Sequence, residues 1–162
     1  MLLPPDDNIL KNGFCWGKYD PKLDDESRLR FPKEVLGILT EHKVTELYRC
    51  PDPAGVGFIL CPPGNWKMFF QTVKKHFAKS SEAERAFRLL CSGLPASIDS
   101  QGRIRITKAC MDHAKVGPGN RVNMLGVGKW FEISVYNNGT EAKELVFKES
   151  KILQNTPSGT KI

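Results

Sequence analysis

Apolar and basic residues alternate in the stretch RIRIT at positions 103–107. Successive side chains of a β-strand point to opposite faces, so Ile104 and Ile106 share one face while Arg103 and Arg105 share the other. The pattern predicts a strand with one face in the core and a strongly basic second face.

A tight turn is predicted directly before this strand, over the residues DSQG. An Asp side chain accepts hydrogen bonds from backbone N–H groups that follow it, and glycine adopts a positive φ without steric cost. Asp99 and Gly102 are therefore expected to form the turn and to support Arg103 at the start of the strand.

The same combination occurs earlier in the chain, in the stretch LDDESRLRFP. Asp24 and Ser27 belong to the predicted turn, and Arg28 and Arg30 occupy the polar face of the strand that follows. The two copies lie 75 residues apart, and in each copy the first Arg comes four residues after an Asp. A repeat of this kind indicates two related halves within one chain.

Two amphipathic helices are predicted between the copies. Apolar residues recur at helical spacing from Trp66 to Phe77, and Asn65 is the expected N-cap of this helix. The next helix is expected to open at Ser81, because the spacing from Ser81 to Glu84 fits a capping box. The residues of this helix expected to face inward are Phe87, Leu90 and Cys91.

Each half is predicted to run through a strand, a basic turn-strand, a short helix and a hairpin, and the first half adds the two helices. This order predicts an α+β fold that is mainly β. The short helices are expected over 33–41 and 108–116, and the remaining strands over 14–19, 44–50, 55–61 and 121–136. The expected divisions are an N-terminal arm (1–12), a first repeat (13–95), a second repeat (96–137) and a C-terminal tail (138–162).

Composition adds a preference for an anionic partner. The chain has 162 residues, a formal net charge of +6 and 40% hydrophobic residues, which is typical of one globular domain with a basic surface. A moderate positive charge favours nucleic acid as a partner, although the placement of the charges decides more than their sum.

Several other classes are disfavoured by the sequence. No run approaches the ~20 apolar residues that a bilayer requires, so we expect a cytoplasmic protein without a membrane partner. The sequence shows no zinc-type spacing and no G-x-S-x-G, H-E-x-x-H or phosphate-binding glycine motif, so no metal, cofactor, small-molecule substrate or catalytic residue is predicted. The cysteines are expected to be reduced and mostly buried: Cys15, Cys50, Cys61, Cys91 and Cys110.

The paired stretches LDDESRLRFP and IDSQGRIRIT resemble the twice-repeated D-x-K-G-R signature of the MraZ family in the SpoVT-AbrB superfamily. Three further stretches are similar to that family in the same order: FILCPPGNW, ERAFRLLCSG and MLGVGKWFEI. The resemblance spans residues 13–136. It departs from the signature at Glu26 and Gln101, which stand where Lys is usual, at Ser27, where Gly is usual, and at Lys108, where Pro is expected.

The resemblance implies two βαβ-like repeats interleaved in one swapped-hairpin, AbrB-like double-split β-barrel. It also implies a nucleoid-associated transcriptional regulator that binds repeated promoter sites of the division and cell-wall gene cluster as a ring-shaped homo-oligomer. The family's double-stranded DNA contacts carry over to Arg28 and Arg103, of which we expect Arg103 to be the better placed. From charge placement alone, Arg30 and Arg105 are added to the expected DNA-binding residues.

Two other function classes stay open at this stage. One is an antitoxin-like assembly module that uses the same barrel to hold a protein partner. The other is a small enzyme. This class is less favoured, because His42, His76 and His113 lie in unrelated sequence contexts.

Overall fold

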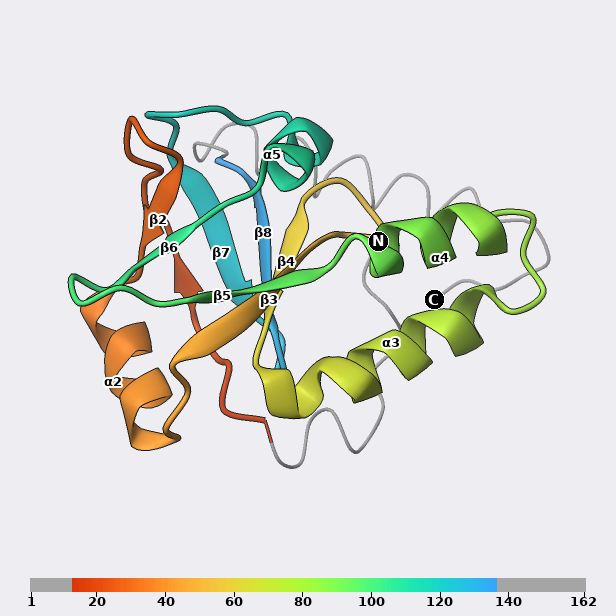
Figure 1. The fold of residues 1–162 in the computed structure, drawn as a ribbon, viewed down its shortest axis with the longest axis horizontal. Helices are drawn as coiled ribbons and strands as arrows, with labels where there is room; N and C mark the ends of the chain where they lie inside the picture. Colours follow the sequence, from red (N-terminus) through yellow and green to blue (C-terminus); the bar gives the residue numbers. More distant parts are fainter. Residues whose placement is uncertain (1–12, 137–162) are drawn as a thin grey trace, which may run out of the picture.

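The computed structural model describes residues 13–136, which form a mixed α+β fold with antiparallel strand pairing (Figure 1). A six-stranded sheet has the order β1, β7, β8, β4, β3 and β5, and β2 pairs with β6 in a separate two-stranded ribbon. The strands are β1 (Lys18–Tyr19), β2 (Arg28–Arg30), β3 (Glu46–Pro51), β4 (Phe58–Cys61), β5 (Leu94–Ser97), β6 (Arg103–Arg105), β7 (Val122–Gly126) and β8 (Phe131–Val135).

The predicted helices are all present in the described residues. They are α2 (Lys33–Glu41), α3 (Pro63–Phe77), α4 (Ala83–Cys91) and α5 (Lys108–Ala114). The bounds of α2 match the prediction, and α5 begins where predicted, with the hydroxyl of Thr107 accepting a hydrogen bond from the Cys110 N–H as an N-cap. In Figure 1, α3 and α4 lie together on one side of the sheet, away from the β2–β6 ribbon.

The two halves exchange strands. β1 of the first half pairs with β7 of the second. β5, which begins two residues before the expected boundary but leads into the second turn, belongs with the second half and pairs with β3 of the first. Tyr19 lies opposite Met124, and a shift of 75 residues relates this pair to Leu94 and Arg49, which also lie opposite each other. Because both pairings use the same register, the halves are related by an approximate two-fold axis, and neither half completes its sheet alone.

The backbone pairing within residues 13–136 shows an open sheet and a ribbon, with the end strands β1 and β5 each paired on one side. It does not show a closed barrel, so that expectation stays a prediction. The α+β class and the sequence of elements in each half are confirmed by the observed strands and helices.

The buried residues form two hydrophobic clusters. The larger lies between the sheet, the β2–β6 ribbon and helices α2 and α5, and it includes Leu29 and Ile104, which are 0% and 1% exposed. The smaller lies beneath α3 and α4, where Phe69 and Trp130 meet edge to face with ring centroids 4.9 Å apart. The apolar faces predicted for both basic strands are therefore core faces.

The starts of α3 and α4 differ from the prediction. Helix α3 begins at Pro63, because the first position of a helix has no intrahelical partner for its N–H and therefore tolerates proline. Asn65 does not cap the helix but donates its side-chain N–H to the Lys129 carbonyl. Helix α4 has no side-chain cap bond, and the Ser80 hydroxyl accepts from the Glu82 N–H one residue before the expected cap. The prediction of Asn65 and Ser81 as N-caps was wrong.

The inward face of α4 was also mispredicted in part. Leu90 is buried, as expected, but Phe87 is 48% exposed and Cys91 is exposed. Ala86 is the second buried residue of this helix, so the stripe that faces the core is narrower than the periodicity indicated. Phe87 instead contacts Phe70 of α3 edge to face, with centroids 6.0 Å apart. The other four cysteines are buried, as predicted.

Some expectations lie outside the described residues. These are the arm at 1–12 and the tail at 138–162. Across the part of the chain that the structure describes, none of the helices has the length and apolar character needed to span a bilayer.

Candidate nucleic-acid interface

The two predicted turns have the same hydrogen-bond geometry. Asp24 Oδ1 accepts the backbone N–H groups of Glu26 and Arg28, each at 2.9 Å. Asp99 Oδ1 accepts those of Gln101 and Arg103, also at 2.9 Å. In each turn, one carboxylate oxygen of the aspartate therefore closes the turn by accepting two backbone N–H groups.

The second carboxylate oxygen of each Asp orients the Arg that follows. Asp24 Oδ2 lies 2.8 Å from Arg28 Nε, and Asp99 Oδ2 lies 2.9 Å from Arg103 Nε. The Arg28 backbone N–H is the main cause of a lowered pKa at Asp24. At Asp99 desolvation acts in the opposite direction as the largest single effect, but the hydrogen bonds from Arg103 and Gln101 together still lower the pKa. Both carboxylates are therefore ionised at neutral pH.

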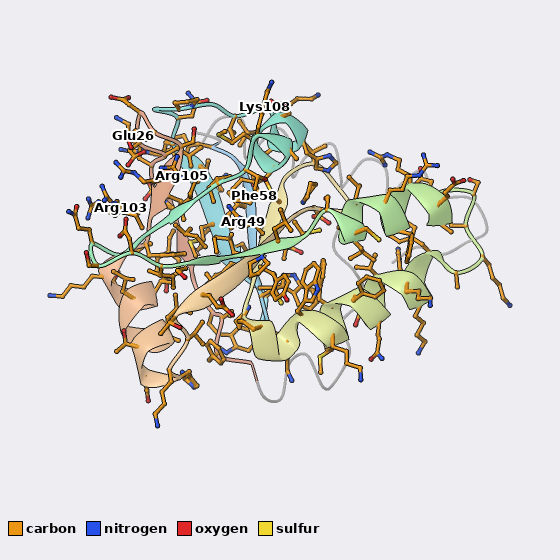
Figure 2. The ribbon with its side chains drawn as sticks, in the orientation of Figure 1. Glu26, Arg49, Phe58, Arg103, Arg105 and Lys108 are labelled. Carbon is orange, nitrogen blue, oxygen red and sulfur yellow. The ribbon has the colours of Figure 1, made fainter. Side chains whose placement is uncertain are left out.

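The β2–β6 ribbon brings the four arginines together on one face. Arg28 lies opposite Arg105, and Arg30 lies opposite Arg103. Between these two pairs, Leu29 lies opposite Ile104, and both side chains point into the core. Figure 2 shows Arg103 and Arg105 on the ribbon, on the side of the molecule away from α3 and α4. All four side chains predicted as DNA-binding residues are thus adjacent.

The outer arginines each reach the opposite turn. Arg30 Nη1 donates to the Gln101 carbonyl at 3.1 Å, and Arg105 Nη1 donates to the Glu26 carbonyl at 3.0 Å. Each bond links the two repeats, and the pair obeys the same approximate two-fold symmetry as the sheet. The ribbon is therefore held as one unit in which each turn is braced by an arginine from the other half.

The four arginines differ in availability. The side chains of Arg28 and Arg103 are 24% and 17% exposed and are occupied by their aspartates. Arg30 and Arg105 are exposed, and within residues 13–136 neither has a carboxylate oxygen within 4.0 Å. Arg30 and Arg105 are thus the more accessible cations, whereas Arg28 and Arg103 also shape the turns.

The two turns differ in charge. The first contains Asp25 and Glu26, and Glu26 Oε2 lies 3.5 Å from Arg28 Nη2. The corresponding residues of the second turn are Ser100 and Gln101, which are neutral. Coulomb attraction of Glu26 for Arg28 competes with any external anion, so the first turn presents a weaker positive potential than the second.

Arg49 is a further cation beside the ribbon that the sequence analysis did not single out. It lies on β3 and donates to the Arg105 carbonyl at the end of β6, with Nη1 2.8 Å from the oxygen. The pairing of β3 with β5 brings Arg49 to this position, and no local motif marks it. Figure 2 shows Arg49 beside the strand that carries Arg105.

Two titratable groups away from the ribbon, His113 and Cys15, are held within the fold. His113 Nε2 lies 2.9 Å from the Asp52 carbonyl and 2.7 Å from the Gly55 carbonyl, so it ties α5 to the β3–β4 turn. Burial raises the pKa of Cys15 to about 12 and so keeps its thiol protonated. Among residues 13–136, no group of three or more His, Cys, Asp or Glu side chains is arranged to hold a metal ion.

The chain matches no protein-family model and no curated protein.

Proposed function

We propose that this protein is a DNA-binding transcriptional regulator of the MraZ kind, and that the β2–β6 ribbon is its DNA-binding surface. The observation that carries the proposal is the cluster of four arginines on one face of a ribbon whose other face is in the core. Arginine binds phosphate through charge and a fork of N–H donors, and it reads guanine through O6 and N7.

The arrangement of the cations suits duplex DNA better than a small anion. The arginines follow an extended two-stranded ribbon, which is a shape that the major groove admits. Their approximate two-fold symmetry suits the two strands of a duplex, and the turns are fixed before binding by their aspartates. Arg30 and Arg105 supply the most accessible donors, and Arg28 and Arg103 supply the oriented ones.

The strand exchange supports the finer fold proposal. In a swapped-hairpin barrel, each repeat contributes strands to the sheet of the other, as β1 and β5 do here. We place the closed barrel, the ring-shaped homo-oligomer and action at the promoter of the division and cell-wall cluster within this same proposal. Repeated copies of the ribbon around a ring would engage repeated DNA sites with avidity.

The test is fluorescence anisotropy with a labelled duplex from the stretch upstream of the protein's own gene, set against a scrambled duplex. Wild type should prefer the upstream duplex, and R30A/R105A should lose this preference. R28A/R103A should lose it as well. The matched control is K67A/K74A, which removes two exposed cations from α3 and should bind like wild type.

Light scattering coupled to size exclusion should report the same oligomer for wild type and all variants. Equal binding of both duplexes by wild type, or wild-type binding by R30A/R105A, would contradict the proposal. If K67A/K74A lost as much binding as the ribbon variants, the loss would be explained by the change in net charge alone. This result would also contradict the proposal that the ribbon is the DNA-binding surface.

A further inference from the structure

Within residues 13–136, the hydrogen-bond partners of the Arg49 side chain are all backbone carbonyls. Its Nε donates to the Leu94 carbonyl at 3.2 Å, Nη1 donates to the Arg105 carbonyl at 2.8 Å, and Nη2 donates to the Pro95 carbonyl at 3.3 Å. The guanidinium therefore joins edge strand β5 to the end of β6 and is fixed in one orientation. A fixed guanidinium loses little entropy when it binds a further acceptor.

The charge of Arg49 is not neutralised within the described residues. No carboxylate oxygen of residues 13–136 lies within 4.0 Å of it, although Arg28 and Arg103 are both paired. Partial burial lowers the pKa of Arg49, but a guanidinium stays protonated at any pH at which the protein is folded. Arginine has five N–H donors, so three carbonyl bonds leave donors on both Nη atoms for an external anion.

Arg49 has no counterpart in the other repeat. The approximate two-fold axis relates it to Met124, which is fully buried and lies opposite Tyr19. The second turn-strand therefore has a cation at its C-terminal end that the first lacks. The second turn also lacks the two acidic residues of the first, but the ribbon is antiparallel, so Arg49 lies at the other end, beside the first turn, where Arg105 is opposite Arg28. Arg49 therefore adds positive potential at the end of the ribbon that the acidic turn weakens.

We propose that Arg49 binds a DNA phosphate next to Arg105, so that this end of the ribbon makes a backbone contact that the buried Met124 cannot make at the other end. This inference rests on the proposed DNA binding and adds a residue and an asymmetry to it. The ligand chemistry is an unesterified phosphate oxygen of duplex DNA, which both a rigid Nη donor and an unpaired positive charge favour.

The experiment measures the affinity of the full chain for the upstream duplex as a function of salt, for R49M and R49K. R49M introduces the residue found at the related position and conserves apolar volume. Each phosphate contact contributes about 0.9 to the slope of log K against log salt, so R49M should reduce the slope by about 0.9 for each engaged subunit. R49K keeps the charge and should retain most of the slope.

The control is R85M, which removes an exposed arginine from α4 and should leave the slope unchanged. Thermal unfolding of each variant shows whether the carbonyl contacts of Arg49 also stabilise the fold. A wild-type slope for R49M, or the same loss in R49K or R85M as in R49M, would overturn the inference.

These outcomes are separable from failure of the proposed function. If R30A/R105A loses specific binding while R49M binds with the wild-type slope, the ribbon remains the DNA-binding surface and Arg49 is only structural. If wild type itself shows no preference for the upstream duplex, both proposals are overturned.

Discussion

Ser27 and Gly102 occupy the same position of the two turns and share a left-handed backbone, with φ of 61° and 75°. Both N–H groups donate to the carbonyl of the turn's aspartate, Ser27 to Asp24 at 3.1 Å and Gly102 to Asp99 at 3.0 Å. The turn therefore requires a positive φ, which glycine adopts without strain and serine does not.

Replacement of Ser27 by glycine should stabilise the protein. The left-handed region costs a non-glycine residue about 1–2 kcal/mol, and the greater freedom of glycine in the unfolded chain offsets part of the gain. We expect S27G to raise the free energy of unfolding by about 0.5–1 kcal/mol, as measured by urea denaturation. An equal or lower stability of S27G would show that the serine side chain compensates for the strain.

Replacement of Gly102 by alanine should have the opposite effect. A Cβ at this position would lie 2.5 Å from Leu36 Cδ1, and the φ of 75° is unfavourable for alanine. Leucine can move its side chain, so we attribute most of the loss, about 1–2 kcal/mol, to the backbone. The control is G37A in α2, where an added Cβ meets nothing within 4 Å. This substitution should stabilise the protein, because alanine favours the helix more than glycine does. Similar urea midpoints for G102A and wild type would contradict the prediction.

The acidic residue of the first turn should weaken DNA binding. Glu26 Oε2 lies 3.5 Å from Arg28 Nη2, whereas Gln101 is its neutral counterpart. We expect E26Q to tighten binding by about two- to fivefold at low salt and Q101E to weaken it by a similar factor, which is the range for an exposed charge. Anisotropy titrations at two salt concentrations check this, since both effects should shrink at high salt. Changes of the same sign in the two variants would refute it.

The local chemistry of the turns could be predicted from sequence, whereas contacts made by distant strands could not. Asp99 and Gly102 form a turn because of bonds within five residues, so the composition of that stretch was sufficient. Arg49 reaches Arg105 only because β3 pairs with β5, and the residues of β5 were not predicted, since Pro95 and neighbouring small residues obscure its strand pattern. The register of the exchanged strands likewise depends on pairing between halves.

The buried face of a helix could be predicted from sequence only where the helix packs against a single neighbouring element. The stripe of α3 matches the core because its buried residues Phe69, Val73 and Phe77 follow the helical period. Helix α4 packs against both α3 and the sheet, so Ala86 and Leu90 were sufficient to fill the available space and Phe87 was left at the surface. Periodicity gives the position of an apolar stripe and not how much of it the neighbours cover.

Glu132 should make the stability of the protein depend on pH. It lies opposite Ile59 at the centre of the sheet, and its side chain accepts a hydrogen bond from the Trp130 indole N–H at 3.5 Å. Burial, and to a smaller extent the nearby Asp52, raise the pKa of Glu132 from 4.5 to about 7. Because the folded state binds this proton more tightly than the unfolded state, the stabilisation is complete below pH 4.5 and is lost as pH rises to about 7.

We therefore expect wild type to lose about 2–3 kcal/mol more than E132Q between pH 4.5 and 8, as measured by urea denaturation. Glutamine keeps the shape of the protonated side chain and carries no charge at either pH. The pKa of Asp52 is also raised by burial, with the same sign, and the two carboxylates interact, so the difference between the two curves reports Glu132 together with its coupling to Asp52. Parallel stability curves for wild type and E132Q would mean that Glu132 is hydrated in the folded protein and keeps an ordinary pKa.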